Sequence, residues 1–238
     1  MAEAAAAVKR VTSDPADRRY KYLDLLINIF VVVLIVSNLV AQKFTDFGPF
    51  KISAAQLLFP ITYIFGDVFT EVYGYSASRR AIWTGFIGSS VMTAMGLFAI
   101  WLPPSADFKN QAAFVALFGV VPRVVAGSLL AYWAGEFANS LTVAKMKLWT
   151  DGRWLWTRTV GSTVVGQAVD TTIVVCFIFY DQPISLIWQI IYSGYIFKVV
   201  YEVLATPLTY LIVNGLKRAE GIDFYDRSTN FNPFRWRQ

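Results

Sequence analysis

Six long apolar segments constrain this chain more than any other feature of its sequence. They lie at residues 23–41, 53–75, 81–102, 112–138, 159–180 and 184–213. A helix rises about 1.5 Å per residue, so roughly 20 apolar residues match the hydrocarbon core of a bilayer, which is about 30 Å thick. Only 16% of the 238 residues are charged, compared with about 25% in an average soluble domain. We therefore predict an all-α, polytopic membrane protein with six transmembrane helices.

The distribution of basic residues predicts the orientation of these helices. Sixteen of the 21 Lys and Arg residues flank the segments on the side that both termini share, and three flank them on the other side. Cytoplasmic loops are the ones enriched in Lys and Arg. The sequence thus predicts cytoplasmic tails at 1–21 and 217–238 around a transmembrane domain at 22–216. The net charge of +5 is explained by this pattern, so we expect no nucleic-acid partner.

The residue types that are missing narrow the possible chemistry. The chain has no histidine, a single cysteine (Cys176) and no GxxxxGK[ST] motif. It therefore lacks an intramolecular disulfide framework, the commonest metal ligand and general base, and a nucleotide-binding P-loop of its own. We expect no metal, no cofactor and no enzymatic activity.

Ionisable residues inside the apolar segments are the main functional clue. A charge at the bilayer centre costs about 2.5–3.5 kcal/mol on insertion scales, so such residues must face one another, a water-filled cavity or a ligand. Arg123 can answer one of the acids or extend its side chain to the interface. Glu136 and Asn139 fall near the cytoplasmic end of their segment, where solvation at the interface is sufficient. The ionisable residues in or near the segments are Asp67, Glu71, Arg123, Glu136, Asp170, Lys198 and Glu202.

Two of the acids share one face of the second segment. Asp67 and Glu71 are four residues apart, and Pro60 precedes them where it can free a backbone carbonyl. One interpretation is a polar, broken helix that lines a substrate cavity. The alternative is a carboxylate pair neutralised by Arg79 or Arg80 at the cytoplasmic boundary.

Polar residues also recur at helical spacing in three other segments. In the fifth, Gln167 and Asp170 extend a row of Ser and Thr residues, which favours a cavity wall over simple helix packing. In the sixth, Lys198 and Glu202 are four apart and can form an ion pair that also opens onto a ligand. Near the outer end of the first segment, Asn38 and Gln42 share a face. Small residues at intervals of four, at Gly85, Ser89 and Thr93 and at Gly127, Ala131 and Gly135, predict close helix packing.

A short internal similarity suggests two related halves. Gly66-Asp67 in the second segment would correspond to Gly166-Gln167 with Asp170 in the fifth. Halves of three helices each would be inverted with respect to one another in the membrane. Such transporters place the substrate site at the interface of the halves.

These motifs resemble the queuosine precursor transporter family of bacterial inner-membrane proteins, which are also grouped as vitamin-uptake transporters. The resemblance extends over about residues 22 to 216. It rests on Asn38 with Ala41-Gln42-Lys43, Pro60-x6-Asp67-x3-Glu71-x-Tyr73-Gly74 followed by Arg79-Arg80, Arg158-x3-Ser162-x4-Gln167-x2-Asp170-Thr171, and Lys198-x3-Glu202-x4-Pro207.

The resemblance implies import of 7-cyano-7-deazaguanine or 7-aminomethyl-7-deazaguanine into the cytoplasm. A deazaguanine offers adjacent N–H donors to a carboxylate and a carbonyl to Gln, Asn or Lys. The site it implies has Asp170 or Glu71 at the base edge. Gln167, Asn38 and Gln42 would add hydrogen bonds, while Asp67, Lys198 and Glu202 would shape or gate the cavity.

Other interpretations remain open at this point. The chain could be the substrate-binding membrane subunit of an energy-coupling vitamin importer, which would depend on a separate ATPase. An intramembrane hydrolase would need a nucleophile and a base, and a purely structural protein would not need so many charges in the membrane. Energy coupling, by protons or by facilitated diffusion, and the preferred deazaguanine are undetermined. Self-association, as a dimer, is a further expectation.

Overall fold

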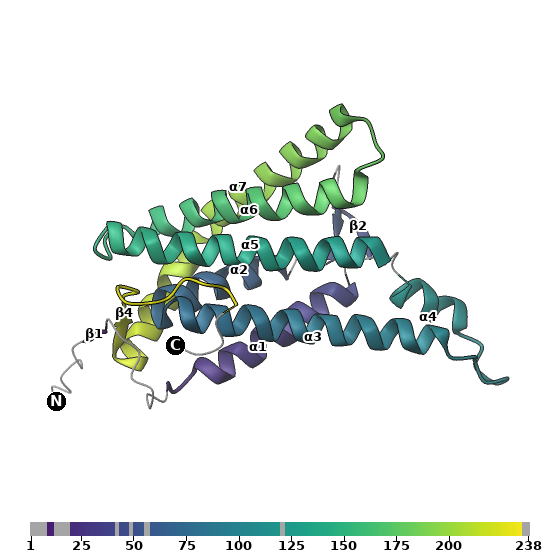
Figure 1. Cartoon of the computed structure of the whole chain (residues 1–238), viewed down its shortest axis with the longest axis horizontal. Helices are drawn as coiled ribbons and strands as arrows, with labels where there is room; N and C mark the ends of the chain where they lie inside the picture. Colours follow the sequence, from purple (N-terminus) through teal and green to yellow (C-terminus); the bar gives the residue numbers. More distant parts are fainter. Residues whose placement is uncertain are drawn as a thin grey trace.

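The computed structural model describes residues 9–11, 20–40, 43–47, 50–54, 58–119 and 122–234. Helices dominate this part of the chain, and two small two-stranded sheets accompany them (Figure 1). The all-α prediction is therefore confirmed in its main feature. In chain order the elements are β1 (Lys9–Val11), α1 (Leu23–Val40), β2 (Phe44–Phe47), β3 (Phe50–Ser53), α2 (Phe59–Val68), a π-helical turn (Phe69–Tyr73), α3 (Tyr75–Trp101), α4 (Gln111–Phe118), α5 (Pro122–Trp149), α6 (Leu155–Phe179), α7 (Ile184–Glu220) and β4 (Ile222–Phe224).

Four of the described helices, α1, α3, α6 and α7, are long and apolar enough to cross a membrane. Large apolar side chains on three of them stay more than half exposed: Val32 is 59% exposed, Met95 58% and Leu204 74%. Water would penalise such surfaces, whereas lipid tails do not. The chain is therefore a multi-pass membrane protein, as its sequence predicts.

The second and fourth predicted segments differ from the structure. The segment 53–75 is a short helix, α2, that runs into the π-helical turn. Pro60 lies in the first turn of α2, where a missing N–H breaks no helical hydrogen bond. The expected break of the helix at this proline therefore does not occur. The segment 112–138 is two helices, α4 and α5. Pro122 begins the second of these, because proline fits the first helical position but not the interior.

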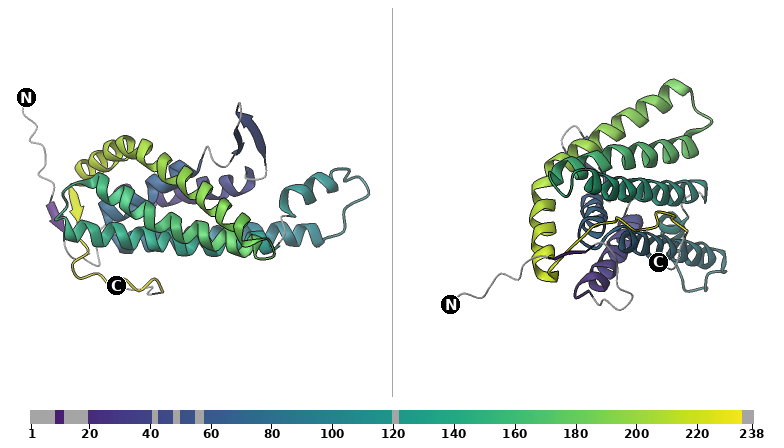
Figure 2. Two further views of the ribbon diagram at one scale, coloured as in Figure 1. Left: turned by 90° about the horizontal axis from the view of Figure 1, so that it is seen from above. Right: turned by 60° about the vertical axis from the view of Figure 1, so that its left-hand side comes forward.

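The long helices form a continuous series of contacts around α2. In this series α1 contacts α3, α3 contacts α5, α5 contacts α6, and α6 contacts α7, while α2 packs against α1, α5 and α7. Figure 1 and Figure 2 show α5 and α6 side by side over most of their length. The polar positions on α2, α5, α6 and α7 consequently face a common interior.

Glycines allow α5 and α6 to approach this closely. A Cβ added to Gly135 would lie 2.7 Å from Cβ of Asp170 and 3.1 Å from the carbonyl oxygen of Gly166. A Cβ added to Gly127 would lie 2.8 Å from the ring of Phe177. The prediction that this face packs closely is confirmed.

Helix α7 is 37 residues long and contains Pro207. Figure 2 shows that α7 changes direction between its green and yellow parts. Proline removes a backbone hydrogen bond and is the usual cause of a sharp bend inside a helix. The bend returns the last turns of α7 to the end of the bundle that holds the π-helical turn.

The segment after α7 folds back over α3. The backbone N–H of Tyr75 donates to both carboxylate oxygens of Asp226 at 3.1 Å. Arg79 donates to the carbonyls of Asn230 and Asn232, each at 3.0 Å. Burial raises the pKa of the Asp226 carboxyl above its ordinary value, although its hydrogen bonds oppose that shift. The segment therefore forms a packed cover on this end of the bundle.

We predict that Gly135→Ala lowers the free energy of unfolding by about 1–3 kcal/mol, because the new methyl group collides with α6. The measurement is the thermal unfolding midpoint in detergent. Gly215→Ala is the matched control, since nothing lies within 4 Å of its added Cβ. Alanine there should leave the free energy of unfolding unchanged or raise it by up to about 1 kcal/mol, so the midpoint should not fall. Equal midpoints for the two variants would show that α5 and α6 are not in close contact.

Candidate functional site

Glu71 is the most completely paired carboxylate among the described residues. It lies on the π-helical turn and is fully buried, with 0% of its surface exposed. The turn ends at Gly74, whose φ of +87° favours glycine and whose added Cβ would lie 2.2 Å from the ring of Phe224. Single π-helical turns within helices are frequent at functional sites. This turn directs Glu71 toward three basic residues.

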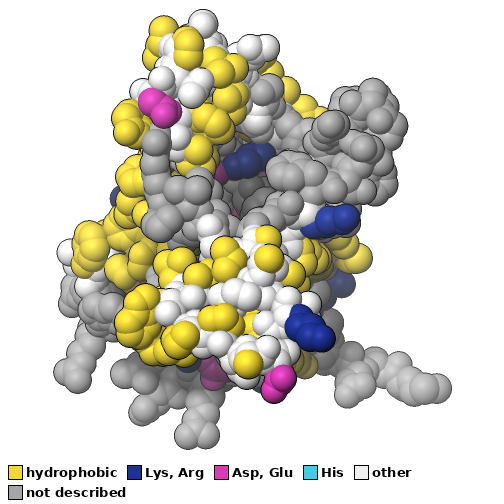
Figure 3. Space-filling model, turned by 90° about the vertical axis from the view of Figure 1, so that its right-hand side faces the viewer, with side chains coloured by type: hydrophobic (Ala, Val, Ile, Leu, Met, Phe, Trp, Pro, Cys, Tyr) yellow, Lys and Arg dark blue, Asp and Glu magenta, His cyan; other side chains and the backbone are white. Residues whose placement is uncertain are grey.

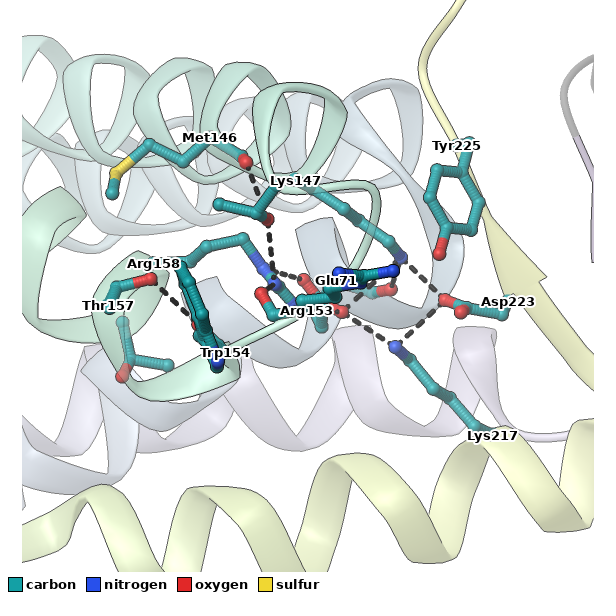
Figure 4. A network of polar contacts seen from close by, with 12 residues as sticks. Glu71, Met146, Lys147, Arg153, Trp154, Thr157, Arg158, Lys217, Asp223 and Tyr225 are labelled. Carbon is teal, nitrogen blue, oxygen red and sulfur yellow. Dashed lines mark hydrogen bonds and ion pairs between the residues drawn. The ribbon is translucent and has the colours of Figure 1, made fainter.

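Each of these cations comes from a different helix (Figure 4). From α6, Arg158 donates to Oε2 of Glu71 at 3.0 Å and to Oε1 at 2.8 Å. From α7, Lys217 donates to Oε1 at 2.6 Å. Lys147 of α5 lies 3.4 Å from Oε1 and donates to the backbone carbonyl of Glu71 at 2.5 Å. A two-pronged Arg–carboxylate contact is the strongest of the side-chain ion pairs.

Asp223 of β4 balances part of the excess positive charge. Its Oδ1 lies 2.6 Å from the ammonium of Lys147 and 2.8 Å from that of Lys217. We call Glu71, Lys147, Arg158, Lys217 and Asp223 the Glu71 cluster. Sequence reasoning offered Arg79 or Arg80 as partners of the Asp67–Glu71 pair. In the structure Arg79 instead holds the C-terminal segment, and Arg80 pairs with Asp24 at the surface.

A second charged pair links α6 to α7. The ammonium of Lys198 lies 2.5 Å from Oδ2 of Asp170, and it also donates to Thr171 at 3.4 Å. The two charged side chains remain about a quarter exposed, at 25% and 22%. Gln167 lies one turn earlier on α6 and is buried. Gln167 and Asp170 thus lie on neighbouring positions of α6, as their spacing predicts, and the structure adds Lys198 of α7 to Asp170, which the spacing did not predict.

Three further carboxylic acids are buried in the interior. Asp67 accepts a hydrogen bond from Asn139 at 3.4 Å. Among the described residues, the other oxygen of Asp67, one oxygen of Glu136 and both oxygens of Glu202 have no hydrogen-bond partner. The expected ion pair of Lys198 with Glu202 is therefore not hydrogen-bonded, since Lys198 donates to Asp170 instead. Glu136 is only 8% exposed. The expectation that water at the membrane interface solvates its carboxylate is therefore wrong.

The remaining predicted positions lie on α1 or beyond it. Asn38 donates to the hydroxyl of Ser89 on α3 at 3.3 Å, which places it in a helix contact. Gln42 lies outside the described residues. No group of three or more His, Cys, Asp or Glu residues suited to a metal ion occurs in the described part of the chain.

The end of the bundle away from the Glu71 cluster is hollowed. Figure 3 looks onto this end and shows a depression near its centre, within which Lys or Arg and Asp or Glu side chains are visible. Charged side chains in a depression of an otherwise apolar molecule are what a polar solute would contact on entry. The geometry therefore provides a fully paired cluster at one end and accessible charges toward the other.

Comparison with known proteins places the chain in a family. Residues 53–212, more than half of the chain, match the family described as "Putative vitamin uptake transporter". The chain belongs to this family. A curated relative, "Probable queuosine precursor transporter" of Bacillus subtilis (strain 168), is 28% identical over 181 residues, which cover 74% of this chain and 78% of the relative. No solved structure matches. The resemblance found in the motifs is confirmed, and the family is one of transporters rather than enzymes.

Sequence reasoning did not foresee the composition of the Glu71 cluster in this transporter. Lys147 and Lys217 follow apolar segments, where basic residues indicate only the cytoplasmic side. Arg158 belongs to a quoted motif, but no sequence spacing connects it to Glu71, which lies 87 positions earlier. Arg158 and Lys217 lie within about one turn of the end of a predicted segment, which is the signal that could have suggested them. Lys147 lies nine residues beyond the segment 112–138 and carries no such signal.

We predict that Glu71→Gln destabilises the protein by about 3–5 kcal/mol, because it leaves the buried charges of Lys147 and Arg158 without their anion. The thermal midpoint in detergent and the amount of folded protein in membranes measure this loss. Asp24→Asn is the control, since Asp24 pairs with Arg80 at an exposed site and should cost no more than about 1 kcal/mol. Similar midpoints for both variants would contradict a structural role for the cluster.

Proposed function

We propose that this protein imports a queuosine precursor, 7-cyano-7-deazaguanine or 7-aminomethyl-7-deazaguanine, across a bacterial inner membrane. Membership of the transporter family supports transport, and the similarity to the Bacillus subtilis protein described as a probable queuosine precursor transporter supports this substrate class. The observation that carries the proposal for the site is the Asp170–Lys198 pair. This pair joins α6 to α7 inside the bundle and leaves both partners about a quarter exposed.

The chemistry of that pair suits a deazaguanine. The ring presents two adjacent N–H donors, which one carboxylate can accept together, and a carbonyl that an ammonium or an amide N–H can satisfy. In the proposal Asp170 accepts from the two donors, and Lys198 and Gln167 donate to the carbonyl. Asp67 and Glu202 lie deeper in the bundle along the proposed path, and Asn38 and Gln42 are kept in the proposal as hydrogen-bonding residues, although Gln42 lies outside the described residues.

Glu71 has a different role in this proposal from direct contact with the base. Three cations already share its carboxylate, and no part of it is exposed. Exchange of these partners for a ligand would leave buried positive charges unpaired, at a cost of several kcal/mol. We propose that the Glu71 cluster keeps the end of the bundle closed while the substrate enters from the opposite end.

We predict that Asp170→Asn reduces uptake of labelled precursor into proteoliposomes by about 10- to 100-fold. Hydrogen bonds to charged groups contribute about 1.5–3 kcal/mol, and each 1.4 kcal/mol is a factor of ten. Asp181→Asn, a substitution in the exposed α6–α7 connection, is the control and should transport normally. Full uptake by Asp170→Asn would refute the assignment of the base edge. Uptake only after addition of a copurified ATPase would favour the energy-coupling importer subunit.

We further propose six membrane crossings in two inverted halves, with α2 and the π-helical turn as the second crossing and α5 as the fourth. Both termini are cytoplasmic in this arrangement, and the chain functions as a homodimer. The excess of Lys and Arg at the end that holds both termini supports the orientation.

Cysteine labelling tests this topology. In a Cys176→Ser background, Ser105→Cys and Ser228→Cys place a thiol at two exposed positions, one between α3 and α4 and one after β4. We predict that a membrane-impermeant maleimide labels the first variant on intact cells and the second only after permeabilisation. Labelling of both on intact cells would contradict a cytoplasmic C-terminus.

A further inference from the structure

Three carboxylic acids from three helices lie close together in the interior. They are Asp67 of α2, Glu136 of α5 and Glu202 of α7, which we call the buried carboxyl trio. Their exposed fractions are 1%, 8% and 1%. Four of their six carboxyl oxygens have no hydrogen-bond partner among the described residues. A Cβ added to Gly66, the residue before Asp67, would lie 3.0 Å from Oε2 of Glu136, so α2 and α5 bring these acids together.

The charged groups around the trio do not neutralise it. Negative charges of Glu202, Glu71 and Glu136 act on Asp67, and those of Asp170 and Glu202 act on Glu136. Within the described residues, Asp67 accepts a hydrogen bond from the uncharged amide of Asn139 at 3.4 Å. Tyr132, one turn before Glu136, is half-buried, and its buried hydroxyl oxygen likewise has no hydrogen-bond partner among the described residues.

Four described basic residues of the bundle donate to other acids. Lys147, Arg158 and Lys217 surround Glu71, and Lys198 donates to Asp170. Arg123 lies 13 residues before Glu136 on α5, which corresponds to about 20 Å along a helix. The trio is therefore a concentration of negative charge that the described side chains leave uncompensated.

Buried carboxylates without a cation partner are stable only when protonated. An isolated ionised carboxylate in a low-dielectric interior is so costly that the group takes up a proton instead, and like charges nearby add to the cost. A metal ion is not favoured, because the described acids do not converge in the arrangement that a metal ion needs. We propose that Asp67, Glu136 and Glu202 form a proton-binding site that couples uptake to a proton gradient, an inference that rests on the proposed transport function.

The coupling of proton binding to substrate transport follows from the difference in exposure between the Asp170–Lys198 pair and the buried carboxyl trio. Asp170 and Lys198 remain partly exposed, whereas the trio is closed off from solvent. Ionised acids of the trio are tolerated only while water reaches them, so the bundle closes over its substrate only after the protons have bound. On the other side each proton leaves its carboxyl oxygen for water. Proton and substrate therefore cross in the same direction.

The first test needs no substrate. Infrared spectra of the detergent-solubilised protein, titrated from acidic to alkaline pH, should show a protonated-carboxyl band that persists at neutral pH. Glu136→Gln should diminish this band, and Asp24→Asn, at an exposed ion pair, should not. Absence of the band from the unsubstituted protein at neutral pH would overturn the proposal, even if Glu136→Gln failed to fold.

The second test uses labelled 7-cyano-7-deazaguanine and proteoliposomes that are more acidic outside than inside. The gradient should accelerate uptake by the unsubstituted protein and by Asp24→Asn, and Glu136→Gln should lose this response. Uptake that is indifferent to the proton gradient, or that follows a sodium gradient instead, would overturn the proposal. A complete lack of precursor uptake under all conditions would refute the proposed function, while the infrared titration would still decide whether the trio binds protons.

Discussion

The carboxylate of Glu71 holds together elements that are distant in the sequence. It binds α5 through Lys147, α6 through Arg158 and α7 through Lys217, and Asp223 extends the contacts to β4. A buried anion with several cations is stable only if all partners are present, because loss of any one leaves an unpaired charge. The π-helical turn, the bend of α7 and the packing of the C-terminal segment all serve to bring these groups to one place.

The structure treats its intramembrane charges in three different ways. The Glu71 cluster is fully paired and buried, which suits a structural role. The Asp170–Lys198 pair is complete but partly exposed, so a ligand with matching donors and acceptors can replace one partner. The buried carboxyl trio has no compensating cation among the described residues and needs protons to be stable. This gradation in compensation and exposure is the physical basis of both proposals for transport.

The close packing of α5 and α6 relates the two sites to each other. Because Gly135 and Gly166 let the two helices approach, Asp170 lies near enough to Glu136 for their charges to interact. A substrate that changes the charge balance at Asp170 would therefore act directly on one member of the trio. Coupling between sites requires such a shared interaction, and here it crosses a single helix interface.

Helical spacing was enough to predict much of the candidate site. It placed Gln167 next to Asp170 and identified the small-residue face of α5, because residues three or four apart share a helix face whatever the helix packs against. Spacing indicated Glu202 as the partner of Lys198, because the two residues are four apart on one helix. It could not predict that Lys198 donates to Asp170, which lies on another helix. It also misjudged Glu136, whose burial depends on neighbours from α2 and α7.

The sequence by itself determined that this chain is a helical membrane protein, because apolar length and charge placement are set by the bilayer and not by the fold. Its motifs also determined the transporter family. Only the tertiary structure decided which acidic and basic side chains pair with one another. Arg158 and Glu71 are 87 positions apart, and their contact depends on a π-helical turn that the periodicity of the sequence does not predict. Long-range ion pairs are properties of packing, so local sequence spacing does not contain them.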